Sequence, residues 1–128
     1  MDTPKISLVI LHDLFAVCKL RADESFPSWA LCNSFYSLTR TPDELSIVCP
    51  QDLVPEGVEA ARQWKCLRVE GKLDFGSVGI LSSLTSSLAD IGISIFAIST
   101  YDTDYLFVRE SDLARGVAAL LKAGHDIR

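Results

Sequence analysis

Two carboxylates one residue apart mark the part of this sequence best suited to chemistry. Asp102 and Asp104 flank Thr103 in the segment ISTYDTDY, residues 98–105. Paired carboxylates can carry out acid–base catalysis or bind a hard cation. A cation site needs more oxygen ligands than this segment offers, and a hydrolase needs a nucleophile with a partnered histidine. The alternative is that these residues only cap a turn through hydrogen bonds from side chain to backbone.

A second polar segment, DFGSVG, lies at residues 74–79. Its small residues allow a ligand to approach the backbone closely. At the start of a helix, free backbone N–H groups and the positive end of the helix dipole can hold a ligand carboxylate without a basic side chain. The segment lacks the Gly-Lys-Ser/Thr ending of a Walker motif. The alternative is that Asp74 only caps the helix, while Gly76 and Gly79 permit close packing.

The hydrophobic pattern predicts the elements that position these two segments. A β-prone run at residues 64–69 precedes the first of them. Residues 93–98 are too β-branched and too short for a helix, so they predict a largely buried central strand. With residues 105–108 they predict a hairpin around the paired aspartates. An amphipathic helix that ends near Gly92 is indicated by apolar residues at steps of three and four, namely Ile80, Leu81, Leu84, Leu88 and Ile91.

A further helix is expected after the hairpin. Ser111 suits its N-cap and Gly124 its end. Its apolar face consists of Leu113, Val117, Leu120 and Leu121. With residues 125–128 as the stub of a last strand, this half of the chain follows the order βαββα.

The first half of the chain carries a weaker pattern. Residues 14–20 predict a strand, and residues 35–40 with 45–49 predict a hairpin. Residues 25–32 are too short for the crossover helix of a full βαββ unit. A helix is expected instead at residues 54–63, with Pro55 in its first turn.

Several of these segments resemble the ACT domain, in a small stand-alone bacterial subfamily built from two tandem ACT-like halves. The resemblance is specific over residues 64–121 and weaker before them. The segments that carry it are DF at 74–75, GIL at 79–81, GISIFAISTYDTDY at 92–105, FYSLTRT at 35–41 and ELSIVC at 44–49.

The resemblance implies an α+β fold of the ferredoxin-like βαββαβ type, with antiparallel sheets packed by helices on one face. We expect a degenerate N-terminal ACT-like half at residues 1–61 and a C-terminal ACT domain at residues 62–128. ACT domains pair through their sheets and commonly bind amino acids where two of them meet. The resemblance therefore implies a non-catalytic regulatory module with an amino acid ligand and a regulated protein target. We expect it to form a homodimer or a side-by-side pseudo-dimer within the chain. The alternative is a structural or protein-interaction module that has the fold and no ligand.

The resemblance also assigns roles within the proposed site. Arginine-sensing relatives in the superfamily hold the ligand's side chain with an acidic residue at this strand end, and Asp104 matches that position. A ligand carboxylate is expected near the backbone of residues 75–79, and its ammonium or basic side chain near Thr100 and Asp104. The complete set of expected ligand-binding residues is Asp74, Phe75, Gly76, Ser77, Val78, Gly79, Ile80, Ser99, Thr100, Tyr101, Asp102 and Asp104.

Composition limits the remaining function classes. With 128 residues, 48% of them hydrophobic, the chain can bury a core, while its formal charge of −5 and scattered basic residues argue against nucleic-acid binding. No apolar stretch approaches the roughly 20 residues of a membrane span, and the N-terminus does not resemble a secretion signal, so we expect a cytoplasmic protein. The cysteines form no Cys-x-x-Cys pair, and His12 and His125 lie far apart. We therefore expect four reduced, mostly buried thiols, no metal site and no cofactor.

Overall fold

A computed structural model describes residues 5–70 and 79–128 of the chain. Its contacts define two compact units. The C-terminal unit comprises Met1–His12 and Lys65–Arg128, and the N-terminal unit comprises Asp13–Trp64. The C-terminal unit is therefore built from two separate stretches of sequence.

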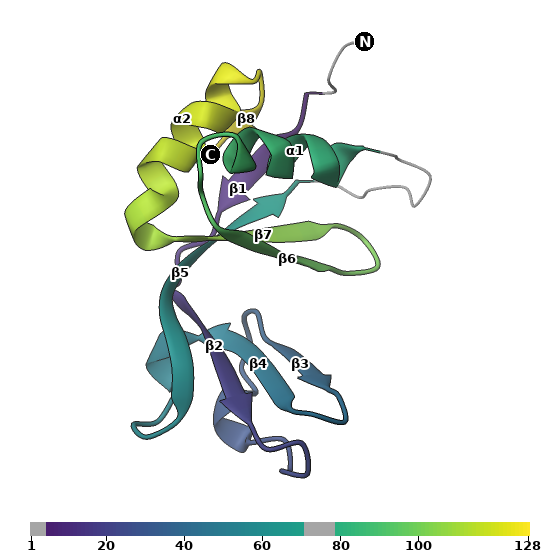
Figure 1. Cartoon of the computed structure of the whole chain (residues 1–128), viewed down its shortest axis with the longest axis vertical. Coiled ribbons are helices and arrows are strands. Elements are labelled where there is room, and N and C mark those ends of the chain that lie inside the picture. Colours follow the sequence, from purple (N-terminus) through teal and green to yellow (C-terminus); the bar gives the residue numbers. More distant parts are fainter. Residues whose placement is uncertain (1–4, 71–78) are drawn as a thin grey trace. The chain divides into compact units, whose positions relative to one another are not determined.

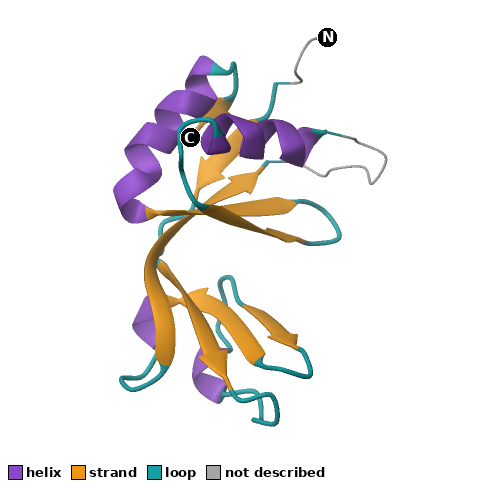
Figure 2. Cartoon of the chain, in the orientation of Figure 1, coloured by secondary structure: helices purple, strands orange, loops and turns teal. Residues whose placement is uncertain are grey.

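The C-terminal unit is an α+β domain with its described helices on one face of a mixed sheet (Figures 1 and 2). The strands lie in the order β6-β7-β5-β1-β8, where β1 is antiparallel to β5 and parallel to β8. The element bounds are β1 Ser7–Ile10, β5 Glu59–Val69, α1 Ile80–Ala89, β6 Ile95–Ser99, β7 Asp104–Arg109, α2 Leu113–Lys122 and β8 Asp126–Ile127. These elements confirm the predicted fold class and its helix–strand order.

One hydrophobic cluster fills the space between this sheet and the helices. Leu84 and Leu88 of α1, both fully buried, follow the predicted stripe, and Leu120 of α2 packs into the same cluster. On the sheet side, Leu106 and Val108 alternate along β7 and point into it. Burying side chains of this size stabilises a fold by about 1.5–3 kcal/mol each.

The C-terminal ends of both helices agree with the sequence prediction, whereas the predicted N-cap of α2 does not. Gly92 and Gly124 adopt positive φ angles of 76° and 100° just after α1 and α2, as their lack of a Cβ allows. The expected N-cap at Ser111 is wrong. A 3₁₀ turn at Glu110–Asp112 precedes α2, and no side chain caps the helix there.

The sequence pattern predicts no element at residues 7–10. In the structure this segment forms β1, whose residues Leu8 and Val9 pair with Val69 and Arg68 of β5. Leu8 is fully buried in the cluster under the helices. The N-terminal stretch thus supplies a central strand of the C-terminal unit. The division into sequence halves at residues 1–61 and 62–128 stays a prediction.

The N-terminal unit is an antiparallel sheet in the order β3-β4-β2-β5. Its further elements are β2 Phe15–Leu20, the 3₁₀ turn Ser28–Ala30, β3 Ser37–Arg40, β4 Leu45–Pro50 and the 3₁₀ turn Gln51–Leu53. The strand and the hairpin predicted for this half are therefore confirmed, and no α-helix occurs in residues 13–64, all of which are described.

The helix expected at residues 54–63 is wrong. A turn carries the chain from Val54 into β5, which begins at Glu59. Gln63 has a φ of 69° and coincides with a register irregularity in the pairing of β2 with β5. Its N–H donates to Oε1 of Gln51 at 2.8 Å. This bonding between β5 and the turn after β4 fixes a bulged strand where local pattern suggested a helix.

His125 makes the stability of the C-terminal unit dependent on pH. Its side chain is 2% exposed, Nδ1 accepts a hydrogen bond from the Ile6 N–H at 3.1 Å, and Nε2 has no hydrogen-bond partner within the described residues. Burial lowers the pKa of His125 from its ordinary value. The unfolded chain therefore binds the proton more readily, and the free energy of unfolding should fall as pH drops below about 6.5 and stay level above it.

Urea unfolding at several pH values checks this expectation. The His125→Gln variant is the control, because it retains a polar side chain and cannot titrate. Its unfolding free energy should lack the additional decline that the wild type shows on acidification. Equal pH slopes in the two proteins would contradict the role given to His125.

The cysteines give an expectation for thiol labelling. All four are free thiols, with Cys18, Cys49 and Cys66 buried and Cys32 half-buried. Burial raises the pKa of Cys66 to about 12, which keeps it protonated and unreactive at neutral pH. A maleimide reagent should label native protein slowly at three sites and denatured protein at all four. Rapid native labelling of several sites, counted by mass spectrometry, would contradict the burial.

Candidate ligand-binding site

The hairpin of the C-terminal unit ends in a tight turn at the paired aspartates. Thr100 and Thr103 close the turn, because the Thr100 N–H donates to the Thr103 carbonyl at 2.8 Å. The Thr100 hydroxyl also donates to this carbonyl at 3.1 Å and accepts from the Thr103 N–H at 3.3 Å. Tyr101, which is 82% exposed, and Asp102 form the tip. The two threonines thus close the turn, and these bonds do not use the carboxylates of Asp102 and Asp104.

Asp104 occupies a different environment from Asp102. It is the first residue of β7, lies directly opposite Ser99 of β6, and is half-buried. The Ser99 hydroxyl donates a hydrogen bond to Oδ1 of Asp104. Since side chains alternate along a strand, Asp104 lies on the same face as Leu106, which packs into the cluster under the helices. The Asp104 carboxylate therefore lies at the rim of the helix-bearing face.

The start of α1 lies over that same face. Ile80 is its first residue and packs against the cluster that contains Leu106. Gly79 precedes it with a φ of 88°. No side chain at this N-cap position accepts a hydrogen bond from the backbone N–H groups of the first helical turn. In Figure 1 the start of α1 and the turn between β6 and β7 lie on the same side of the unit.

Of the predicted site residues, Asp74, Phe75, Gly76, Ser77 and Val78 lie outside the described part of the chain. The described remainder divides between two elements. Ile80 begins α1 and Gly79 directly precedes it, whereas the hairpin end holds Ser99, Thr100, Tyr101, Asp102 and Asp104. One described side chain that sequence reasoning left out, Thr103, donates from Oγ1 to the Val69 carbonyl of β5 at 2.8 Å.

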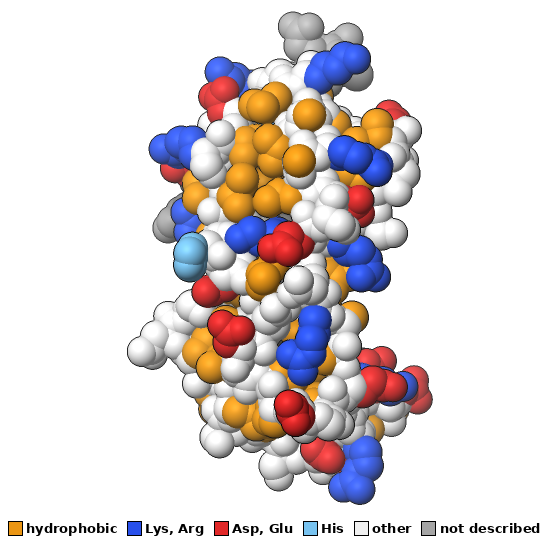
Figure 3. Space-filling view, turned by 90° about the vertical axis from the view of Figure 1, so that its left-hand side faces the viewer, with side chains coloured by type: hydrophobic (Ala, Val, Ile, Leu, Met, Phe, Trp, Pro, Cys, Tyr) orange, Lys and Arg blue, Asp and Glu red, His pale blue; other side chains and the backbone are white. Residues whose placement is uncertain are grey.

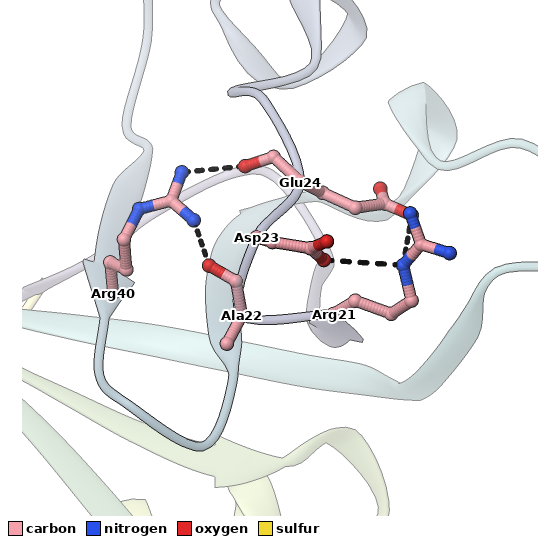
Figure 4. Close-up of polar contacts among 5 residues, drawn as sticks. All are labelled: Arg21, Ala22, Asp23, Glu24 and Arg40. Carbon is pink, nitrogen blue, oxygen red and sulfur yellow. Dashed lines mark hydrogen bonds and ion pairs between the residues drawn. The ribbon is translucent and has the colours of Figure 1, made fainter.

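A polar cluster in the N-terminal unit was also not anticipated (Figure 4). Arg40 donates to the Ala22 carbonyl and, at 2.6 Å, to the Glu24 carbonyl, while Arg21 lies 3.4 Å from a carboxylate oxygen of Asp23. The Arg40 guanidinium also lies 5.2 Å from the centre of the Phe26 ring. The two arginine side chains contact groups of the loop between β2 and β3, so the cluster stabilises that loop.

The described residues lack the features of several other site types. They contain no group of three or more His, Cys, Asp or Glu side chains able to hold a metal ion. None of their helices is long and apolar enough to cross a membrane. On the face shown in Figure 3, Lys and Arg side chains alternate with Asp and Glu, without a continuous basic patch.

The family model described as ACT domain matches residues 59–122. The chain belongs to the ACT domain family. A second model, for an N-terminal domain, matches residues 13–57, which fall within the N-terminal unit. The ACT match covers β5, both α-helices and the hairpin that ends at Asp104.

A curated relative of this ACT protein is named for a sensor. The protein "Cytosolic arginine sensor for mTORC1 subunit 1" of Rattus norvegicus is 32% identical over 98 residues, which cover 69% of this chain and 29% of the relative. The chain spans about half or less of the length of the curated relatives that it matches.

Solved structures agree with the fold. Protein Atu0741 from Agrobacterium tumefaciens is 41% identical with a TM-score of 0.94, over 98% of this chain and 94% of that one. Aspartate kinase from Clostridium acetobutylicum has a TM-score of 0.64 at 12% identity, over 96% of this chain and 36% of the kinase. The second likeness concerns the fold alone.

Proposed function

We propose that this ACT protein is a non-catalytic regulatory module that binds an amino acid, with arginine as the first candidate. The observation that carries the proposal is the Asp104 carboxylate, half-buried at the hairpin end and bonded to Ser99. The arginine sensor named among its relatives supports the choice of ligand.

The chemistry of the site suits a zwitterion with a cationic side chain. We propose that the α-carboxylate of the ligand lies near the backbone of residues 75–79, as the sequence predicts, because the dipole and free N–H groups at the start of a helix favour an anion. The guanidinium is placed at Asp104, which can accept charge-assisted hydrogen bonds from it. Ser99 and Thr100 complete the polar side, and Tyr101 and Asp102 at the tip complete the rim.

Regulation requires a second protein or a second copy. We propose that the C-terminal unit pairs through its sheet, because β6 bonds only to β7 among the described strands and so presents an edge with free backbone groups. Pairing would form a homodimer with the ligand near the boundary and a surface for a regulated target in the cytoplasm.

A calorimetric titration with each of the twenty common amino acids tests the proposed function. Arginine should bind most tightly, lysine more weakly, and neutral or acidic amino acids least, because only a cationic side chain matches the Asp104 carboxylate. Arginine at a hundred times its Kd should also raise the unfolding free energy by about 2.7 kcal/mol. Failure of every amino acid to bind would leave the structural module without a ligand as the remaining function.

The proposed homodimer has its own expected result. Light scattering on the purified chain should give twice the mass of 14.1 kDa. Replacing Ala97 in the middle of β6 by proline should shift the mass to that of one chain, because proline obstructs strand addition at an edge. A wild-type protein that is monomeric with and without arginine would contradict the dimer.

A further inference from the structure

We infer that Thr103 is a positioning residue, whose hydroxyl anchors the Asp104 turn to β5 and so sets where the Asp104 carboxylate meets a cationic ligand. The inference rests on the proposed function, because it concerns the geometry of the same site. It adds a residue that contacts no ligand and acts through Asp104.

The hydrogen bonds of the hairpin end fall into two kinds. The bonds between Thr100 and Thr103, and between Ser99 and Asp104, join residues within the hairpin. They hold the carboxylate relative to its own strands. The Thr103 hydroxyl instead reaches the Val69 carbonyl, 34 residues away in the sequence, at 2.8 Å. This bond fixes the hairpin end relative to another strand of the sheet.

The acceptor is well placed to serve as an anchor. Val69 is the last residue of β5, is 1% exposed, and pairs with Leu8 of β1. It therefore moves with the core of the unit. Thr103 is half-buried, whereas Tyr101 beside it at the tip is 82% exposed. An exposed turn samples more conformations than the strands behind it, so a bond from turn to core restricts Asp104 directly.

The residue type fits this role. Threonine is β-branched, which restricts χ1 and holds the hydroxyl in one direction. Serine retains the donor but has a freer side chain, and valine retains the shape but has no donor. The two substitutions therefore separate the hydrogen bond from the packing at a single position.

The test compares Thr103→Val and Thr103→Ser with wild type in titrations with L-arginine and with L-citrulline, which has nearly the shape of arginine and an uncharged side chain. Thr103→Val should raise the Kd for arginine at least tenfold and the Kd for citrulline less than threefold. Thr103→Ser should restore arginine binding to within threefold of wild type. A loss of preference for the cation is the result that a general destabilisation of the unit would not give.

The outcomes separate the inference from the proposed function. If wild type does not bind arginine, the inference and the choice of arginine as ligand are overturned, and the proposed function is overturned only if no other amino acid binds. If wild type binds arginine while Thr103→Val binds it unchanged, or weakens both ligands equally, only the role of Thr103 is overturned. Should Thr103→Val not fold, Thr103→Ala removes the same hydroxyl without a β-branch and is judged by the same two ratios.

Discussion

Asp104→Asn is expected to weaken arginine binding by about 1.5–3 kcal/mol, a factor of roughly ten to 150 in Kd. The substitution removes the charge that pairs with the guanidinium and retains a side chain of the same size. Ser99 can still donate to the amide oxygen, so the hairpin should remain intact. Calorimetric titration measures the loss, and the urea midpoint without ligand should change little.

Asp102→Asn is the matched control for this variant. It removes an identical charge two residues away, at the exposed tip of the same turn. A fully solvated charge on the rim of the site interacts weakly with a nearby ligand charge, so the Kd of Asp102→Asn should stay within about threefold of wild type. Equal binding by wild type and Asp104→Asn would remove Asp104 from the site, and equal losses in both variants would point to a general field effect.

Leu8→Ala should destabilise the C-terminal unit by about 2–5 kcal/mol, the range for emptying a buried leucine position. Leu8 is fully buried under the helices, although it lies 57 residues before the first residue of the unit's second stretch, Lys65. The described α-helices both belong to the C-terminal unit, so the helical circular dichroism signal during urea unfolding reports its stability. Trp29 and Trp64 both belong to the N-terminal unit, so the urea midpoint read from their fluorescence should shift far less than the midpoint of the helical signal.

Leu121→Ala provides the comparison, since that side chain on α2 is 51% exposed. Its removal should cost well under half as much as that of Leu8, because less apolar surface returns to water. If the helical signal of Leu8→Ala is lost at the same urea midpoint as in wild type, β1 does not belong to the core of the C-terminal unit.

The sequence was most informative where structure is set by local pattern. The stripe of α1, the glycines at 92 and 124 and the run of β6 each depend on neighbours a few residues away, and their elements were predicted. The central position expected for β6 was wrong, because among the described strands it pairs with β7 alone and lies at the edge of the sheet. β1 was missed because a four-residue apolar run has no periodicity of its own and its partners lie far along the chain. Residues 54–63 were misjudged because the bulge at Gln63 depends on Gln51.

The same division applies to the site. The hairpin end with Asp104 follows from a break between two β-prone runs, so its existence could be predicted. The partnership of Asp104 with Ser99 depends on strand register, and the Thr103 bond to Val69 depends on which strands are neighbours. Both require the assembled sheet. The roles given to residues 74–78 remain predictions.

The insertion of β1 between β5 and β8 has a consequence for the order in which the protein can be completed. Among the described strands, β1 leaves the ribosome first during synthesis, and β8, its neighbour, leaves last. The N-terminal unit is contiguous and can fold while β1 still waits for partners. A fragment cut at residues 59–122 would contain the matched ACT segment but neither β1 nor β8. It would expose one side of β5 as an unpaired edge, and aggregation of that fragment should follow.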